Sequence, residues 1–433
     1  MKYIYLPEKY HLVVGDKFEL FYRGIIKMFN PYQYYISVKC PKGKPFPRYY
    51  TFTPEPKDVG EYELSVELID NELNVIDKAV TTLIVEEPSK PSKELTVLCF
   101  GDSLTVNGVW PKEAYRRVCK EEGTPNGLNM GDVLNFIGTC KVEESCDLVG
   151  YEGYGGWTWK SYCTADHIGL NSSIWITAKH NKTESDQHSI WKSNGYFWIL
   201  ETIENNRLKF KRGPNNISMV SNIGEKLEHV ENAANTDDII IDSYEYEKTN
   251  PFWDKEISDI NFIKYCEKNN FKKPDLIYIL LTWNGLWQPY NHNFEHHFEY
   301  TRKMLRHIHE VLPNTLVTLL GIQICSVNGG IAWNYGASGP YSDAFGSICT
   351  AFHYNEQLEQ LTKTDEFKDY TSYVDVKSQF DSEYNMPSFD IQVNARNPIT
   401  EKIGNNGVHP TMNGYLQIGD ALYRKLVHDI KKY

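Results

Sequence analysis

Ser103, Asn284 and His409 are the residues of this chain whose types and positions could do chemistry. Ser103 comes directly after the apolar run 95–100, and Asn284 follows a second apolar run, 275–281. His409 stands just before the last helical pattern of the chain. A serine in the turn after a buried strand projects its hydroxyl beyond the sheet, near the amino end of the following helix. An imidazole that takes the hydroxyl proton would make this serine a nucleophile.

A glycine cluster supplies a further group for the same chemistry. Gly156 closes the sequence Gly153-Tyr154-Gly155-Gly156, which follows an apolar segment. A glycine there would let a backbone N–H approach an oxyanion, and the Asn284 amide could be aimed at the same oxygen. Each position alone also fits a turn, a cap or a loop histidine. Their common order beside strand ends favours one active site.

Two short motifs resemble those of the GDSL esterase family, also called SGNH hydrolases. The first is Gly101-Asp102-Ser103-Leu104, and the second is Gly407-Val408-His409-Pro410, which leads to Gly414-Tyr415. The resemblance covers roughly residues 95–432. It implies a three-layer α/β/α sandwich around a parallel sheet.

The resemblance also implies a role for each candidate residue. Ser103 would be the nucleophile and His409 the base that takes its proton. The Ser103 N–H, the Gly156 N–H and the Asn284 amide would form the oxyanion hole. No cofactor and no metal is expected for this chemistry.

The chain departs from the family pattern at two places. Thr282 and Gly285 flank Trp283-Asn284 where the family has Gly-x-Asn-Asp. Asn406 occupies the position of the family's acid, three residues before His409. Asn406 could orient the imidazole without supplying a negative charge. Alternatively, a carboxylate from elsewhere stands in, or a backbone carbonyl supports a serine–histidine dyad, and the flexible turn around Asn406 favours these two.

The pattern of the chain changes twice along its length. Short β-branched and aromatic segments predict a β-sandwich domain at 1–87, and a polar, proline-bearing linker follows at 88–94. Apolar runs at 95–100, 275–281 and 316–322 alternate with helical patterns, notably 294–311 and 413–432, and predict an α/β domain with a parallel sheet at 95–433. A hairpin pattern within it predicts a β-rich insertion at 164–246.

Composition limits the partners of the chain. Its 433 residues carry 57 acidic and 45 basic side chains, a net charge of −12, without a long basic run. Nucleic acid and membranes are therefore poor candidates. Neither a spanning segment nor a signal peptide is evident, so we expect a cytoplasmic or virion-associated protein. Nine scattered cysteines predict reduced thiols, and the pairs His296-His297 and His307-x-His309 predict a solvated helix face, not a metal site.

Tryptophans near the motifs suggest a sugar-binding site. Trp157, Trp283, Trp287 and Trp333 lie in or beside the predicted loops, where indole faces could stack on a pyranose ring. The predicted reaction is removal of a short acyl group, O-acetyl first, from a carbohydrate. The alternatives are a lipase or thioesterase, and a non-catalytic glycan-binding or structural protein.

The layout of a small β-domain before a GDSL domain resembles tail-associated carbohydrate esterases of bacterial viruses. This layout suggests homo-oligomerisation or virion assembly through the amino-terminal domain.

Overall fold

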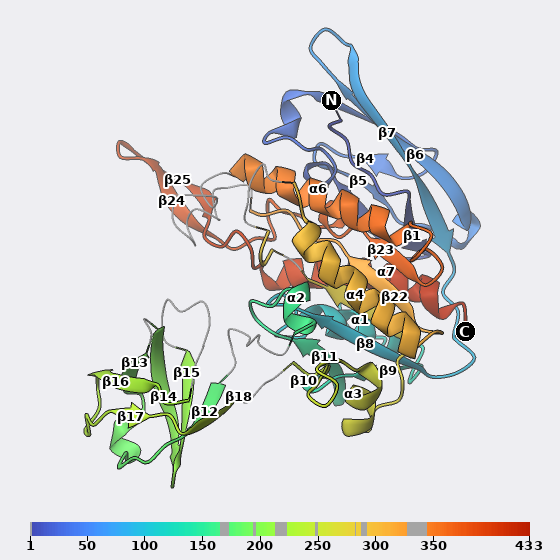
Figure 1. Cartoon of the computed structure of the whole chain (residues 1–433). Helices are drawn as coiled ribbons and strands as arrows, with labels where there is room; N and C mark the ends of the chain where they lie inside the picture. Colours follow the sequence, from blue (N-terminus) through green and yellow to red (C-terminus); the bar gives the residue numbers. More distant parts are fainter. Residues whose placement is uncertain are drawn as a thin grey trace. The chain divides into compact units, whose positions relative to one another are not determined.

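The computed structural model describes residues 2–164, 173–193, 196–212, 223–246, 250–281, 283–286, 292–326 and 344–433. It is a mixed α/β protein rich in strands. The chain forms two compact units, of which the first joins Met1–Gly153 to Asn270–Tyr433 and the second is Tyr154–Asn269 (Figure 1). In the described segments, no helix is both long and apolar enough to cross a lipid bilayer.

A largely parallel sheet forms the centre of the first unit. β8 (Leu95–Gly101) pairs in parallel with β21 (Leu276–Leu280), followed by β22 (Leu316–Leu320) and β23 (Thr371–Val374). The other edge of β8 is shared by β9 (Leu134–Ile137) and β11 (Asp147–Gly153), and β10 (Cys140–Glu144) pairs with β11. The strands predicted from the three apolar runs are confirmed as β8, β21 and β22. The chain thus leaves β8 toward one edge and later returns to its other side.

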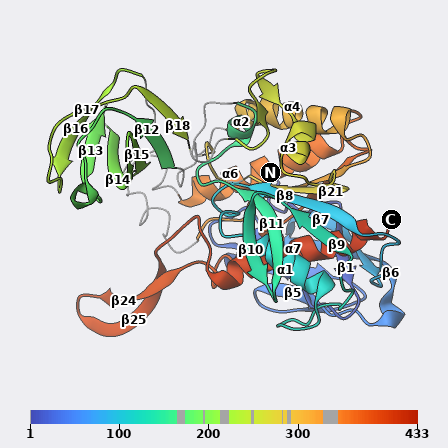
Figure 2. The ribbon, with the colours of Figure 1, turned by 90° about the horizontal axis from the view of Figure 1, so that it is seen from below.

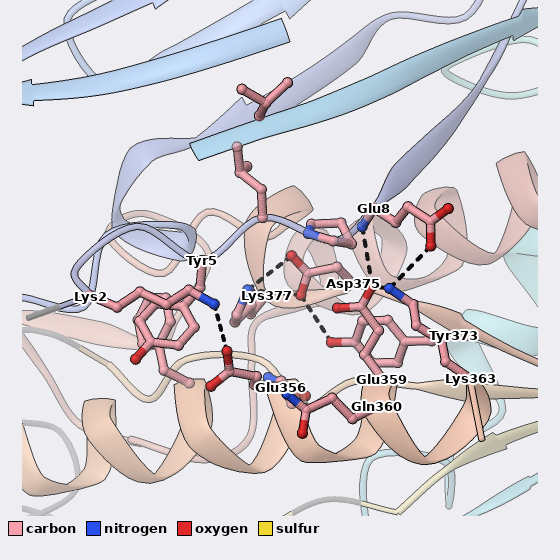
Figure 3. A pocket seen from close by; sticks show the side chains of 15 residues that line it. Lys2, Tyr5, Glu8, Glu356, Glu359, Gln360, Lys363, Tyr373, Asp375 and Lys377 are labelled. Atoms are coloured by element: carbon pink, nitrogen blue, oxygen red, sulfur yellow. Dashed lines mark hydrogen bonds and ion pairs between the residues drawn. The ribbon is translucent and has the colours of Figure 1, made fainter. Parts of the chain in front are cut away.

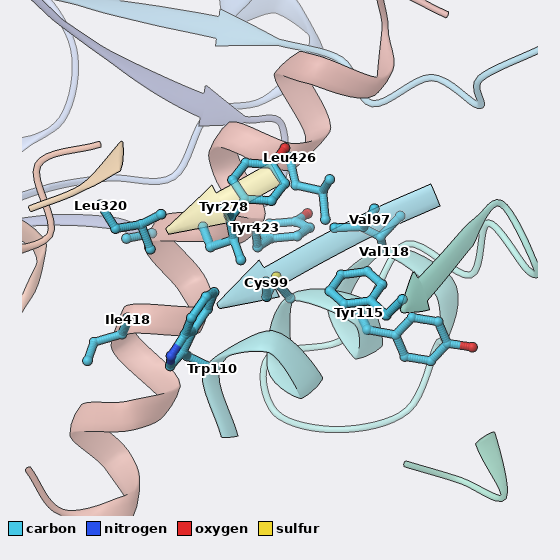
Figure 4. Packing of buried hydrophobic residues seen from close by; sticks show 14 of the residues in the cluster. Val97, Cys99, Trp110, Tyr115, Val118, Tyr278, Leu320, Ile418, Tyr423 and Leu426 are labelled. Atoms are coloured by element: carbon cyan, nitrogen blue, oxygen red, sulfur yellow. The ribbon is translucent and has the colours of Figure 1, made fainter. Parts of the chain in front are cut away.

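Helices cover both faces of this sheet. α1 (Val109–Cys119) and α7 (Met412–Ile430) pack on one face, where Trp110 and Ile418 meet Cys99 and Tyr278 (Figure 4). α4 (Glu295–Val311) and α6 (Ala344–Thr362) lie on the opposite face (Figure 2). Every residue of β8 is buried, as expected for a strand covered on both sides. The helices predicted from the patterns at 294–311 and 413–432 are confirmed as α4 and α7.

The amino-terminal residues form two further sheets within the same unit. One has the order β1-β7-β6-β3, and the other has the order β2-β5-β4. Apolar side chains such as Leu12, Phe18 and Leu64 form their common core. The strands are β1 (Lys9–Val13), β2 (Phe18–Phe21), β3 (Tyr35–Lys39), β4 (Lys44–Pro45), β5 (Tyr49–Phe52), β6 (Gly60–Ile69) and β7 (Val75–Glu86).

Buried ion pairs join the amino-terminal sheets to the parallel sheet's helices. Asp16 accepts hydrogen bonds from Arg117 of α1 and Arg424 of α7, each at 2.6 Å. All three side chains are buried. Arg117 also pairs with Asp420, and Arg424 donates to Gln379 at 2.9 Å. Two guanidinium groups from different helices therefore depend on one carboxylate of the amino-terminal part.

The second unit is built around an antiparallel sheet of order β17-β16-β13-β14-β15-β12-β18. Trp191, Trp198 and Phe210 belong to its apolar core. The predicted hairpin is confirmed as β14 and β15. The unit's elements are α2 (Trp159–Tyr162), β12 (Ser173–Thr177), β13 (Ile190–Ser193), β14 (Tyr196–Glu204), β15 (Arg207–Arg212), β16 (Lys226–Glu231), β17 (Ile239–Ile240), β18 (Ser243–Tyr246), β19 (Trp253–Asp254), β20 (Asp259–Ile260) and α3 (Phe262–Lys268).

A two-stranded hairpin precedes the loop that carries His409. β24 (Ser388–Asn394) and β25 (Asn397–Gly404) pair only with each other and extend away from the parallel sheet in both views (Figures 1 and 2). The sequence did not predict this hairpin. β25 ends at Gly404, two residues before Asn406.

We predict that Asp16→Ala lowers the free energy of unfolding by about 3 kcal/mol or more, because it leaves Arg117 and Arg424 buried without their shared carboxylate. Urea denaturation followed by tryptophan fluorescence measures the change. The control is Asp390→Ala, which breaks an exposed pair with Lys402 and should cost less than about 0.5 kcal/mol. Equal stabilities of the two variants would contradict this account of the junction.

Candidate active site

Ser103 lies in a series of turns that follows β8. Gly101 ends the strand so close to β21 that an added Cβ would lie 2.1 Å from the Leu280 carbonyl oxygen. The Asp102 N–H donates to the same carbonyl at 3.3 Å. α1 starts only at Val109, so Ser103 does not sit at a helix amino end as the elbow pattern predicts. The turn is instead fixed by its close approach to the neighbouring strand.

The structure brings Ser103 and His409 together from distant parts of the sequence. The His409 Nε2 lies 2.9 Å from the Ser103 Oγ, which is hydrogen-bond distance. Both residues are half-buried, so the hydroxyl is reachable from solvent. Burial lowers the pKa of His409 below its usual range, because desolvation disfavours the imidazolium. The imidazole is therefore neutral at neutral pH and can accept a proton.

Asn406 holds the backbone of the loop that carries this imidazole. Its Oδ1 accepts hydrogen bonds from the Val408 N–H at 3.0 Å and the His409 N–H at 2.9 Å. The side chain thus closes a turn in the manner of an Asx motif. Among the residues that the structure describes, no carboxylate contacts the His409 imidazole.

Asp102 orients the Asn284 amide next to the turn that carries Ser103. The Asn284 Nδ2 donates to the Asp102 Oδ2 at 3.2 Å, and the other carboxylate oxygen accepts from the Leu104 N–H at 3.1 Å. Asp102 is completely buried. Because a carboxylate only accepts, the amide nitrogen of Asn284 must face it. The sequence suggested Asp102 only as a turn residue. Its position after a buried strand was the one signal available for its contact with Asn284.

Gln323 braces the histidine loop from the end of β22. Its Nε2 donates to the Val408 carbonyl at 2.8 Å, and its side chain is completely buried. The Ser326 N–H donates to the Gly407 carbonyl at 3.2 Å. Gly407 and Val408, which lie inside the turn that Asn406 closes, are therefore held by a second segment. A polar residue just after the third apolar run was the only sequence signal for this role.

Two of the predicted residues, Gly156 and Trp157, belong to the second unit. Gly156 has a φ of +80°, a conformation that favours glycine. Trp157 is fully buried, and its ring centroid lies 4.4 Å from that of Tyr154 and 4.7 Å from that of Tyr162. The oxyanion role of Gly156 and the sugar-binding role of Trp157 stay predictions.

The other tryptophans also stay predictions. Trp283, in the first unit, is 1% exposed. Trp287 and Trp333 lie outside the described residues.

A cavity of about 260 Å³ in the first unit lies away from these residues (Figure 3). Its lining includes neither Ser103 nor His409. The charged side chains around it pair with one another, as Lys2 does with Glu356 at 2.5 Å and Lys377 with Asp375 at 2.9 Å. Such paired groups offer little to a ligand, so this cavity is not a second reaction centre.

Comparison with known proteins gives few matches. No family model matches this chain, and no curated protein matches it. A solved structure of a peptidoglycan O-acetylesterase is similar over 79% of this chain and 93% of that chain, with 11% sequence identity and a TM-score of 0.30. An endo-fucoidan hydrolase of glycoside hydrolase family 107 is similar over 55% of this chain and 28% of that chain, with 12% identity and a TM-score of 0.13. Similarities at these TM-scores carry no information about what this chain does.

The lowered pKa of His409 predicts the pH dependence of catalysis. Because the base must be neutral, kcat/KM for p-nitrophenyl acetate should hold its plateau down to below about pH 6.5. Asn406→Asp keeps an oxygen for both backbone N–H groups and adds a charge that favours the imidazolium. In this variant the pH at which kcat/KM falls on the acid side (the acid limb) should rise by about one pH unit.

The matched control for this shift is Asn405→Asp, which adds the same charge at an exposed neighbour. Solvent screens that charge, so the acid limb should move much less. A wild-type limb above pH 6.5, or identical shifts in both variants, would refute the assignment.

We predict that Gln323 acts on turnover as a positioning residue. Gln323→Leu removes the donor to the Val408 carbonyl and should lower kcat about tenfold with KM nearly unchanged. The control, Asn355→Leu, removes a buried amide that bonds Ile322 on the same segment but not the histidine loop. It should lower the Tm and leave kcat within about twofold. Equal losses of kcat in the two variants would show a merely structural role.

Proposed function

We propose that this protein is a serine esterase that works through an acyl-enzyme on Ser103. The observation that carries the proposal is the 2.9 Å separation of the His409 Nε2 and the Ser103 Oγ. A neutral, half-buried imidazole at that distance is placed to take the hydroxyl proton as the oxygen attacks. We further propose a dyad, since Asn406 bonds the loop backbone and no carboxylate among the described residues hydrogen-bonds the His409 imidazole.

The proposed reaction has two steps, acylation of Ser103 and hydrolysis of the acyl-serine. The Ser103 oxygen bonds to the acyl carbon while the His409 Nε2 takes the hydroxyl proton. The tetrahedral oxyanion is met by the Asn284 amide and the Ser103 N–H, with the Gly156 N–H as the family resemblance suggests. The bond to the alcohol then breaks, and His409 returns the proton to the leaving oxygen. Water repeats the attack on the acyl-serine and releases the carboxylic acid.

The position of the site in the sheet supports a GDSL-type hydrolase. Ser103 follows β8 and Asn284 follows β21, and these neighbouring parallel strands lie where the chain reverses its direction across the sheet. Ligands of open α/β sheets bind at the carboxyl ends of strands at such a switch point. We propose that the sheet and its helices form the three-layer α/β/α arrangement of that family.

We propose a short acyl group, O-acetyl first, on a carbohydrate as the substrate. Asn284, Asn406 and Gly407 of the motif segments are polar or small, which favours a short acyl group over a long chain. Ser103 and His409 are both half-buried, so a bulky polar carrier can approach them. Preference for long acyl chains would instead support the lipase or thioesterase alternative.

The test is acetate release from a panel of acetylated polysaccharides and peptidoglycan. Ser103→Ala and His409→Ala should each lower the rate at least about a thousandfold, because the two residues act as one unit. Asn284→Ala should lower kcat about a hundredfold or more with a smaller change in KM. Ser89→Ala, an exposed serine, is the control and should be fully active.

Each result has a distinct meaning. Full activity of Ser103→Ala would end the proposal of a serine esterase. Hydrolysis of p-nitrophenyl acetate without acetate release from any polymer would keep the esterase and remove the carbohydrate. No Ser103-dependent hydrolysis of either kind of substrate would favour the non-catalytic alternative.

A further inference from the structure

A second cluster of reactive side chains lies where the amino-terminal sheet meets the last helix. His11 is on β1, Glu86 is the last residue of β7, and His428 is in the last turn of α7. Each offers one potential metal-ligating atom, and these atoms all lie within 4.8 Å of one another. Within the described residues this is the one such group of three. None of its members belongs to the esterase site.

Both imidazoles turn the same nitrogen toward one carboxylate oxygen. The His428 Nδ1 lies 2.7 Å from the Glu86 Oε2, and the His11 Nδ1 lies 3.5 Å from it. The rings are stacked, with centroids 3.7 Å apart. The His11 Nδ1 is buried and lacks a hydrogen-bond partner. A buried, unsatisfied ligand atom aimed at a carboxylate needs an explanation.

The two oxygens of the Glu86 carboxylate face different groups. Lys431 donates to the Glu86 Oε1 at 3.1 Å and leaves Oε2 to the histidines.

We propose that His11 Nδ1, Glu86 Oε2 and His428 Nδ1 form a binding site for a divalent metal ion, with Zn²⁺ as the best fit. Two imidazoles and one carboxylate are a ligand set that zinc accepts, with water in the fourth position. Small side-chain rotations would bring the donors to about 2.0–2.2 Å from a common centre.

An entry path and an outer hydrogen bond complete the proposed site. A cavity of about 490 Å³ is lined by both histidines, so an ion and its water can reach them. Lys431 holds the second oxygen of Glu86 and so fixes the direction of the first.

The ion would tie the amino-terminal strands to α7. β1 and β7 are paired in parallel and supply two ligands, while α7 supplies the third. α7 starts at Met412, just after the loop that carries His409. The role inferred for the metal is therefore structural, and it does not rest on the proposed esterase activity.

Calorimetric titration of tag-free, EDTA-treated full-length protein with ZnCl₂ tests the site. We expect one equivalent to bind, and the Tm to rise by about 3–5 °C when free Zn²⁺ exceeds its Kd a hundredfold. Co²⁺ should bind at the same place and show the visible absorption of a tetrahedral ion. No heat of binding and no change in Tm with either ion would overturn the proposal.

Three variants locate the binding. Glu86→Gln keeps the size of the side chain, and His428→Ala and His11→Ala each remove one ligand. Each should lower the affinity for Zn²⁺ at least tenfold. The control is His309→Ala, which removes an exposed histidine of α4 and should bind like the wild type. Unchanged binding in Glu86→Gln and His428→Ala, with a folded circular-dichroism spectrum, would refute the site.

Ester hydrolysis separates this inference from the proposed function. At 25 °C the metal-free and metal-loaded proteins should hydrolyse p-nitrophenyl acetate at the same rate, and so should His428→Ala. Loss of hydrolysis in Ser103→Ala with normal zinc binding would support both proposals independently. Zinc-dependent hydrolysis that survives Ser103→Ala would overturn the structural role assigned to the metal.

Discussion

The close parallel pairing of β8 with β21 is the constraint on which the geometry of the site depends. Gly101 is opposite Leu280 in the register, and any side chain there would collide with the Leu280 carbonyl. A shift of one residue would turn both strands' side chains to the other face of the sheet. The turn with Ser103 and the segment with Asn284 leave these two strand ends, and the Asn284 amide donates to Asp102, the residue before Ser103.

The histidine is placed by hydrogen bonds to its backbone. Asn406 fixes two N–H groups of the loop, and Gln323 fixes the Val408 carbonyl from the other side. In a triad, a carboxylate both orients the imidazole and stabilises its charged form. Here the loop orients the imidazole, and no charged group among the described residues stabilises its charged form. A buried imidazole then favours its neutral form, which suits proton abstraction and makes the imidazolium state costly.

Sequence patterns predicted individual strands and motifs. They did not predict contacts between residues that lie far apart in the sequence. The apolar runs predicted β8, β21 and β22, and motif order predicted that Ser103 and His409 act together, whose Oγ and Nε2 lie 2.9 Å apart. The role of Asn284 stays a prediction. The hairpin β24–β25 was missed because its residues alternate without a buried face. The bond of Asp102 to Asn284 joins residues 182 positions apart, which no spacing encodes. No spacing in the sequence relates His11 to His428, which meet only through the fold.

Helix α7 connects these separate features. Its amino end follows the His409 loop, its middle carries Arg424 to Asp16, and its last turn carries His428 to Glu86. Burying guanidinium groups is expensive unless a carboxylate is held in place for them, and the amino-terminal sheets supply that carboxylate. The amino-terminal part therefore contacts α7 at two points, Arg424 and His428, and α7 begins just after the loop that carries His409.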